Sequence, residues 1–240
     1  FVKNALKTGI SDELTALSKF KEMKELAKTD GGARKSKITG IPKLDDANKA
    51  GTAQSSRCTL IVTEGDSAKT LAVAGLSVVG RDHYGVFPLR GKCKNVRDAS
   101  VAQLTGNQEF NDLKKILGLQ QGKDYKDVSE LRYGRLMIMT DADNDGSHIK
   151  GLILNMIDYF WPSLLKLGFV VSMVTPIIKA SRGNQSKSFY TDSAFRAWYG
   201  TGQSGWRIKY YKGLGTSTSA EAREYFKKIE DLTVKFNTDV

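Results

Sequence analysis

The chain has 240 residues, with 37 Lys and Arg against 26 Asp and Glu, which gives a formal net charge of +11. This length suits one or two domains, and hydrophobic and charged fractions of 40% and 26% exclude wholesale disorder. Cys58 and Cys93 are too few for a disulfide scaffold or a structural zinc site. With two His in the chain, a metal held mainly by nitrogen or sulfur is disfavoured, whereas carboxylate-bound magnesium stays open.

No uninterrupted apolar run reaches the roughly 18 residues that a membrane-spanning helix needs. The most apolar stretch, Ile149 to Leu167, is interrupted by charged residues and by Pro162. The first residues, Phe1-Val-Lys-Asn4, lack an initiator Met and a signal sequence. We therefore expect a piece of a longer protein that has no membrane partner.

The positive charge is unevenly distributed along the chain. The basic excess is five over residues 1–58, two over 59–180 and four over 181–240. Within the nearly balanced middle, five basic residues and one acid lie between Arg81 and Arg97, and three acids lie between Asp141 and Asp145. A basic stretch beside an acidic cluster predicts a polyanion bound by the first and a metal bound by the second.

In chain order, the first predicted element is an amphipathic helix over residues 11–28, because apolar residues recur there every three or four positions. Gly31-Gly32 is expected to end this helix, and Ala33 to Lys37 is expected to be a basic linker. The next predicted elements are a strand over Cys58–Thr63, a small-residue helix over Ala68–Gly75 and a strand over Leu136–Thr140.

After Ser147, a wide apolar face predicts a helix that stops before Pro162. The remaining predicted elements are a strand-like segment over Phe169–Ile178, a polar hairpin loop over Arg182–Lys187, a strand over Trp206–Tyr211 and a helix over 219–231. Thr218 and Glu221 have the spacing of a capping box at the start of that last helix. Strands that alternate with helices predict an α/β domain with a mainly parallel sheet flanked by helices.

The segment Asp141-Ala-Asp143-Asn-Asp145-Gly146 first invites comparison with an EF-hand calcium loop. An EF-hand requires a bidentate Glu at loop position 12, where this chain has Leu152, and a helix before the loop, where it has a β-rich run. The calcium-loop interpretation therefore fails twice.

A second interpretation places carboxylates where strands leave a parallel sheet. Glu64 and Asp141 each directly follow a predicted strand, and ligands of open α/β sheets gather beyond the carboxyl ends of strands. If the two strands are neighbours, both acids emerge on one rim, and Asp143 lies on the same side as Asp141 while the chain stays extended. Such a cluster needs a cation, and Mg²⁺ binds one or two carboxylates plus substrate phosphate oxygens.

Two plainer roles stand beside the metal interpretation. Asp, Asn and Gly favour turns, so the acidic triplet alone is equally compatible with a solvated turn. The second acid of Glu64-Gly-Asp66-Ser67 strengthens the metal interpretation, but for Asp66 itself we prefer a role in capping the following helix, a role that Ser67 could also fill.

Two segments have the composition expected for binding the phosphate backbone of a nucleic acid. Arg90, Lys92 and Lys94 flank Gly91, which allows close backbone approach. The turn Gly213-Leu-Gly215, between a strand and a capped helix, is expected to present backbone N–H groups to a phosphate. An ordinary solvated face is the alternative for any single one of these Lys or Arg side chains.

Four motifs, taken together and in this order, resemble those of the TOPRIM region of type II DNA topoisomerases. That region has a Rossmann-like fold. The four motifs are Glu64-Gly-Asp-Ser-Ala68, Pro88-Leu-Arg-Gly-Lys92, Asp141-x-Asp-x-Asp-Gly-Ser-His148 and Tyr211-Lys-Gly-Leu-Gly-Thr216. Further stretches are similar to the eukaryotic branch: Ile41 to Asn48, Asn95 to Ser100, Ile149 to Leu152 and Thr175 to Lys179. The resemblance implies a TOPRIM domain with a C-terminal extension over residues 38–240, preceded by a lead-in helix and linker over 1–37 from an ATPase portion.

The resemblance also implies roles for single residues. Glu64 is expected to be the general acid/base and a metal ligand, and Asp141 and Asp143 to be catalytic as ligands of one or two Mg²⁺ ions, which Mn²⁺ or Ca²⁺ could replace. Asp145 completes the acidic cluster, directly or through water. The DNA contacts expected from the resemblance and from the basic stretch are Arg90, Lys92, Asn95 and Lys212, with His148 as a weaker candidate that could instead satisfy a helix start.

The parent protein is expected to be a nuclear homodimer that passes one DNA duplex through a transient double-strand break in another, driven by ATP. In the family the nucleophilic Tyr comes from a winged-helix domain and acts with the metal site of the other subunit, so we expect no nucleophile among the nine tyrosines here. Alternatives are another TOPRIM-fold enzyme, a primase or nuclease, and a non-catalytic DNA-binding module. We expect this chain alone to bind Mg²⁺ but not to relax supercoiled DNA.

Overall fold

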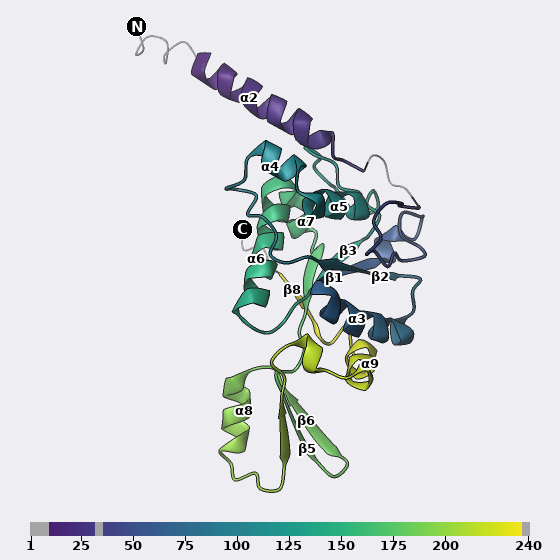
Figure 1. The fold of residues 1–240 in the computed structure, drawn as a ribbon, viewed down its shortest axis with the longest axis vertical. Coiled ribbons are helices and arrows are strands. Elements are labelled where there is room, and N and C mark those ends of the chain that lie inside the picture. Colours follow the sequence, from purple (N-terminus) through teal and green to yellow (C-terminus); the bar gives the residue numbers. More distant parts are fainter. Residues whose placement is uncertain (1–9, 32–35, 237–240) are drawn as a thin grey trace.

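The structure, a computed structural model, describes residues 10–31 and 36–236. Its main body is a five-stranded sheet in the order β2-β1-β3-β4-β8 (Figure 1). The four strands β2, β1, β3 and β4 run parallel, and β8 joins β4 antiparallel. The mainly parallel sheet is therefore confirmed, with the strands β1 (Thr59–Glu64), β2 (Tyr84–Leu89), β3 (Arg135–Met139), β4 (Val170–Met173) and β8 (Thr233–Lys235).

Helices cover both faces of this sheet (Figure 1). In β1, Leu60 and Val62 pack into the core on the side of α5 (Gln108–Leu117), α6 (Asn144–Phe160) and α7 (Pro162–Lys166). Ile61 packs on the other side, against α3 (Gly65–Val79) and α9 (Ser219–Lys227). Burial on both faces explains why the central strands are continuous apolar runs instead of alternating ones. Three shorter helices complete this body: α4 (Val101–Thr105), η1 (Ser55–Arg57) and η2 (Leu214–Thr216).

A second, three-stranded antiparallel sheet in the order β6-β5-β7 lies at the end of the molecule opposite α2 (Figure 1). We call residues 178–210 the small-sheet subdomain; it consists of β5 (Ile178–Arg182), β6 (Gln185–Phe189), α8 (Asp192–Tyr199) and β7 (Arg207–Tyr210). Its core contains Ile178, Ala180, Phe189 and Phe195. The hairpin predicted around Arg182–Lys187 is confirmed, with a tight turn at Gly183, whose φ is +57°.

The prediction of one strand over Phe169–Ile178 is wrong. β4 ends at Met173 in the large sheet, and β5 begins at Ile178 in the small one. Pro176 lies between them and cannot donate a backbone hydrogen bond to a sheet, so the apolar run changes sheets there. Two helices are also longer than predicted, since α3 begins directly at Gly65 and α6 at Asn144 inside the acidic motif. α9 ends at Lys227, and its predicted capping box of Thr218 and Glu221 is confirmed.

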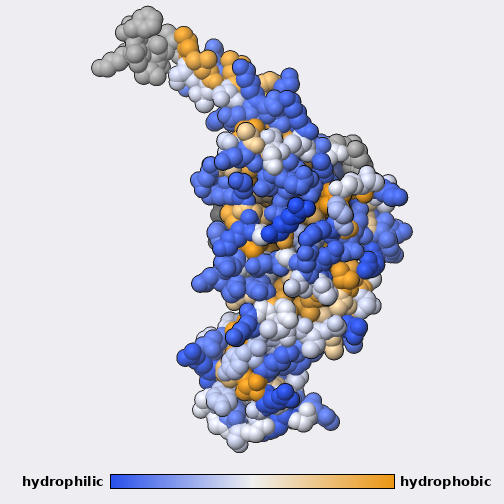
Figure 2. Space-filling view, in the orientation of Figure 1, coloured by the Kyte–Doolittle hydropathy of each residue, from blue (hydrophilic) through white to orange (hydrophobic). Residues whose placement is uncertain are grey.

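The predicted N-terminal helix is present as α2 (Ile10–Ala27), but most of its apolar residues are exposed. Its last turn contributes the buried Leu26 to the core, whereas Leu14, Leu17 and Phe20 are 56–66% exposed. Figure 2 accordingly shows apolar surface along the outer part of this helix. Residues 32–35 of the predicted basic linker lie outside the described residues. No helix in the described ranges is long and apolar enough to cross a membrane.

The buried ammonium of Lys114 fixes the end of α2 to the domain. Its Nζ lies 2.6 Å from Oδ1 of Asp30, 2.8 Å from the Leu26 carbonyl oxygen and 2.9 Å from the Thr29 hydroxyl. The other Asp30 oxygen accepts the backbone N–H of Gln121. Burial lowers the pKa of Lys114, and the hydrogen bond to Asp30 opposes that effect. Since an unpaired buried charge is costly, the pair ties the lead-in helix to α5.

We predict that Lys114→Met lowers the free energy of unfolding by about 3 kcal/mol, because it leaves the largely buried Asp30 carboxylate without its partner. Urea denaturation measures this loss. The matched control is Lys28→Met, which breaks an exposed pair with Glu25 and should cost less than about 0.5 kcal/mol. Equal small losses in both variants would show that the buried pair does not hold α2.

Candidate metal centre and nucleic-acid interface

The pairing of β1 with β3 brings the predicted acidic residues to one rim of the large sheet. The strands are parallel neighbours, with Thr63 opposite Met139. Glu64 is the last residue of β1, and Asp141 lies two residues beyond the end of β3. The sequence prediction that both acids emerge at the same edge, conditional on adjacent strands, is therefore confirmed in its geometry.

Glu64 has an incompletely satisfied carboxylate at this rim. It is both the end of β1 and the N-cap residue of α3, yet its side chain makes no capping hydrogen bond. Its Oε2 atom is buried and has no hydrogen-bond partner among the described residues. Burial raises the pKa of Glu64, and the negative charges of Asp141 and Asp143 raise it further, against a backbone hydrogen bond from Asp141 that lowers it. A partly buried carboxylate that neighbouring negative charges repel favours either a proton or a cation.

Asp141 is held in place by the Lys212-Gly-Leu-Gly turn. Its Oδ1 accepts the backbone N–H of Leu214 at 2.7 Å. A Cβ atom on Gly213 would lie 2.2 Å from the Asp141 Oδ2, so the carboxylate reaches the turn only because residue 213 is glycine. This contact corrects one expectation: the Leu214 N–H binds a carboxylate of the same chain and is not a free donor for phosphate.

Asp143 has an extended backbone, with φ −123° and ψ −175°, but the chain enters a helix at the next residue, so Asp145 does not lie on an extended segment. α6 begins at Asn144, and Asp143 is its N-cap, with Oδ1 accepting the Gly146 N–H at 2.8 Å. A Cβ on Gly146 would lie 2.1 Å from the Asp141 carbonyl oxygen, which explains the glycine of the motif. Asp145 therefore lies in the first helical turn, where carboxylates are favoured.

Asp145 and Lys92 form an ion pair that joins the acidic and basic segments. The Lys92 Nζ lies 2.8 Å from Asp145 Oδ1, with both side chains about half exposed. The hydrogen bond between them lowers the pKa of Asp145 and raises that of Lys92. The structure thus brings together a proposed metal ligand and a proposed DNA contact, which the sequence placed on separate segments.

A carboxylate set of this kind fits Mg²⁺ better than a metal that needs many protein ligands. No group of three or more His, Cys, Asp or Glu side chains in the described ranges is arranged to hold a metal ion. Mg²⁺ commonly uses one or two carboxylates and completes its shell with water and substrate phosphates. The partnerless Glu64 oxygen and the second Asp141 oxygen are the donors that fit this requirement.

The side chains of the other predicted DNA contacts differ in how far they are already engaged in hydrogen bonds. Lys212 and His148 are exposed, and no hydrogen bond or ion pair to either is found within residues 10–31 and 36–236. Arg90 is exposed too, and its backbone N–H donates to Glu109. Asn95, by contrast, already bonds Asp98 and accepts from Asn155 at 2.7 Å. Contact of Asn95 with DNA would therefore require an exchange of partners.

One plainer expectation, that Asp66 or Ser67 caps α3, is not met. The prediction is wrong because α3 already begins at Gly65; Asp66 lies in its first turn and pairs with Lys43 at 2.7 Å. Both cysteines are free thiols, and burial raises the pKa of Cys58 to about 11.

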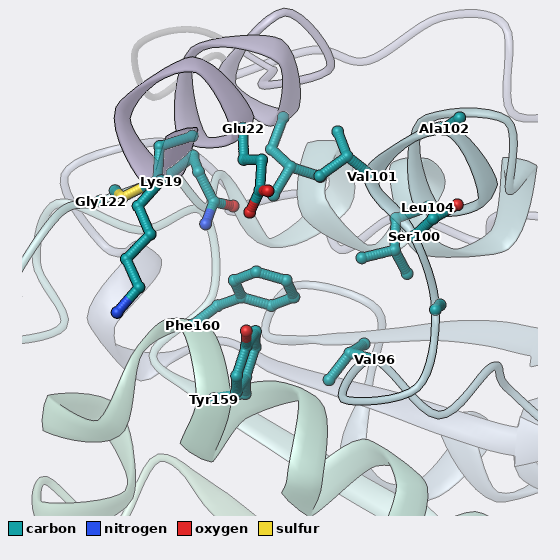
Figure 3. Close-up of a pocket in the computed structure, with 14 residues that line it drawn as sticks. Lys19, Glu22, Val96, Ser100, Val101, Ala102, Leu104, Gly122, Tyr159 and Phe160 are labelled. Carbon is teal, nitrogen blue, oxygen red and sulfur yellow. The ribbon is translucent and has the colours of Figure 1, made fainter. Parts of the chain in front are cut away.

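A pocket of about 720 Å³ lies away from the acidic rim, between the end of α2, the region around α4 and the end of α6 (Figure 3). Its lining includes Met23, Leu26, Val101, Tyr159 and Phe160. None of the predicted site residues lines it, so this pocket is separate from the candidate metal centre.

Comparison with known proteins places this geometry in a family. Residues 59–174 match the Toprim domain, and residues 173–240 match the C-terminal associated domain of TOPRIM. DNA topoisomerase 2 of Drosophila melanogaster is 54% identical over 244 aligned residues, which cover 100% of this chain. The chain belongs to the Toprim family as it occurs in eukaryotic DNA topoisomerase 2.

Other relatives give the same result. DNA topoisomerase 2 of Pisum sativum is 56% identical over 95% of the chain, and human DNA topoisomerase 2-beta is 54% identical over 98%. The crystal structure of the Plasmodium falciparum topoisomerase II DNA-binding, cleavage and re-ligation domain superposes with a TM-score of 0.82 and 56% identity. That match covers 84% of this chain and 28% of the other. The Toprim chain spans only 15–17% of the length of these curated relatives.

Sequence reasoning missed the contact between the Toprim acids and the glycine turn. The motif around Lys212 was interpreted as a phosphate site, whereas two of its residues, Gly213 and Leu214, position Asp141. The signal available in the sequence was the presence of a glycine at position 213. The structure shows that its backbone, with an extended φ of −175°, does not require glycine. A glycine without a conformational need indicates close approach of another group.

We predict that Gly213→Ala lowers the free energy of unfolding by about 1–3 kcal/mol, because its Cβ would collide with the Asp141 carboxylate. The matched control in the same turn is Gly215→Ala, whose Cβ would meet nothing within 4 Å and which should cost less than about 1 kcal/mol. Chemical denaturation distinguishes them. Equal stability of the two variants would contradict the packed arrangement of the turn.

A second prediction concerns pH. Because the folded-state pKa of Glu64 is raised, its ionised form destabilises the fold above that pKa, and the penalty disappears as the pH falls through it. Glu64→Gln should therefore raise the melting temperature at neutral pH in chelator, and the gain should fade toward acid. Glu13→Gln on the exposed face of α2 serves as control. A gain for Glu64→Gln that is independent of pH would rule out this origin.

Proposed function

We propose that this chain is the metal-binding part of the DNA-cleavage centre of a type II topoisomerase. The observation that carries the proposal is the position of Glu64, whose partnerless oxygen lies at the same sheet rim as the carboxylate of Asp141. Relatives that match the whole chain are named DNA topoisomerase 2, which favours this activity over the primase, the nuclease and the non-catalytic module. The parent enzyme would change DNA topology by cleavage, strand passage and religation with ATP.

In this proposal Glu64 and Asp141 would hold one Mg²⁺, and Asp143 and Asp145 beside them would serve a second ion or bound water. Bound Mg²⁺ would act as a Lewis acid that stabilises negative charge on the leaving 3′ oxygen. Asp143 caps α6 through one oxygen, and its other oxygen is the one available to a metal. Asp145 reaches a metal directly only if Lys92 releases it, so its contribution through water is the simpler arrangement.

Glu64 also has the properties of a proton carrier. Its raised pKa brings its titration closer to neutral pH, where a general acid/base works best. We assign it the proton that moves to and from the 3′ oxygen of the cleaved strand. Its place at the end of β1, which pairs with β3, positions its backbone beside the segment that carries Asp141.

The basic residues around this rim would bind the DNA backbone. Lys92, Arg90 and Lys212 are exposed, and Lys92 lies at the acidic cluster through its pair with Asp145. DNA phosphates would compete with Asp145 for Lys92, which couples DNA binding to release of an acid beside the metal. Asn95 and His148 are proposed as further contacts. The partners are double-stranded DNA and a second subunit whose Tyr completes the centre, in a nuclear homodimer.

We predict that Glu64→Gln in the full-length enzyme lowers the DNA cleavage rate by about 10²–10⁴-fold, the range expected for loss of a general acid/base, while DNA affinity stays nearly unchanged. Cleavage assays on supercoiled DNA with parallel binding measurements test this. The control is Asp66→Asn, which alters a neighbouring acid that pairs with Lys43 away from Asp141.

The assignment fails if Glu64→Gln loses DNA binding while the cleavage rate per bound complex is unchanged. It also fails if Asp66→Asn impairs cleavage as strongly, because a general loss of negative charge near α3 would then explain both effects.

A further inference from the structure

The small-sheet subdomain carries a strong positive charge that the metal centre does not use. Residues 178–210 contain six Lys or Arg residues and one acid, Asp192. Asp192 pairs with Arg196 on the same helix turn. Lys179 and Lys209 pair with Glu224 and Glu221 of α9, at the junction with the main body.

Three basic residues of this subdomain have no acidic partner within the described ranges: Arg182, Lys187 and Arg207, all exposed. Arg182 and Lys187 lie on the two strands of the β5–β6 hairpin, and Arg207 begins β7. In the register of the sheet, Arg207 is opposite Ser181, so it faces the side away from Arg182. Both faces of the small sheet therefore present cations without an acidic partner among the described residues.

Aromatic rings hold two of these cations in place. The Arg182 guanidinium carbon lies 4.8 Å from the centre of the Trp206 ring. Lys187 Nζ lies 5.5 Å from the Trp198 ring and 5.6 Å from the Phe189 ring. Trp198 and Trp206 contact each other edge to face at 5.2 Å, so the two cations are supported by one continuous aromatic cluster. The N–H groups at the outer edge of a stacked guanidinium remain available to phosphate oxygens.

The subdomain is also connected directly to the metal rim. β7 ends at Tyr210, two residues before Lys212, and the turn that follows binds Asp141. The five residues of β5 span about 17 Å at roughly 3.3 Å per residue, which corresponds to about five base pairs of duplex. A basic surface that begins beside the cleavage centre and extends by this distance matches a polyanion longer than the cleaved phosphodiester.

We infer that the β5–β6 hairpin of the small-sheet subdomain, through Arg182 and Lys187 on the Trp198–Trp206 cluster, is a second binding surface for the phosphate backbone of duplex DNA. This inference deepens the proposed function, on which its choice of ligand rests. The hairpin takes no part in cleavage and adds affinity by contacting phosphates outside the metal centre. Because its cations meet phosphate and sugar instead of base edges, its contribution is independent of sequence.

The test uses this 240-residue chain and a short fluorescein-labelled duplex, with anisotropy measured over a range of salt concentrations. The variant Arg182→Gln/Lys187→Gln should weaken binding by roughly tenfold at low salt and reduce the slope of log K against log salt by about 1.8, because two phosphate contacts are lost. The matched control, Lys21→Gln/Lys24→Gln on the exposed face of α2, removes the same charge and should leave the slope unchanged.

A charge-conserving variant, Arg182→Lys/Lys187→Arg, separates charge from packing and should retain the wild-type slope. The inference is overturned if the charge-conserving variant loses as much affinity as the Gln variant, if the α2 control weakens binding equally, or if the wild-type chain does not bind the duplex. It is also overturned if the Gln variant keeps its DNA affinity but loses affinity for polyglutamate, which would indicate an acidic protein partner. None of these outcomes involves cleavage, so the metal-centre proposal is tested independently.

Discussion

Electrostatic repulsion among carboxylates at one rim of a parallel sheet is the constraint on which the site depends. Parallel pairing of β1 with β3 forces Glu64 and Asp141 to the same edge, where Glu64 is partly buried and its pKa is raised. The surrounding contacts limit this repulsion without removing it. Asp143 caps α6, Asp145 pairs with Lys92, and Asp141 accepts the N–H of Leu214. Glu64 keeps a buried oxygen that has no hydrogen-bond partner among the described residues, which is the place for a cation or a proton.

Other elements of the chain position the carboxylates at this rim and add surfaces at both ends of the domain. The Lys212-Gly-Leu-Gly turn leaves the small sheet and returns to Asp141, so residues far apart in the sequence position one carboxylate. At the other end, the buried Lys114–Asp30 pair fastens α2 to α5. The Toprim domain thus connects two peripheral elements at opposite ends of one α/β core, a lead-in helix with exposed apolar residues and a basic small-sheet subdomain (Figure 1).

Much of the fold followed from local patterns. The apolar runs before Glu64 and Asp141 predicted two strands, which the structure pairs as neighbours, and Thr218 with Glu221 predicted the start of α9. Sequence patterns failed where tertiary contacts determine the end of a strand or the partner of a side chain. A continuous apolar run over Phe169–Ile178 cannot show that Pro176 moves the chain from one sheet to another. The spacing of the acids is compatible with an extended chain and with a helix cap, so it did not reveal that Asp143 caps α6. Nor could it reveal that the predicted phosphate turn binds Asp141, because that contact joins segments distant in sequence.

The central claim is that Glu64 and Asp141 share one divalent cation. Paramagnetic Mn²⁺, added in less than equimolar amounts to the isotope-labelled chain, broadens amide signals close to the bound ion. We expect the first signals to disappear to be those of Gly65 and Leu214, which flank the two carboxylates, and excess Mg²⁺ to restore them. Broadening should be lost in Asp141→Asn. Broadening that begins instead at exposed acids elsewhere, such as Asp124 or Asp127, or that persists in Asp141→Asn, would contradict a metal site at this rim.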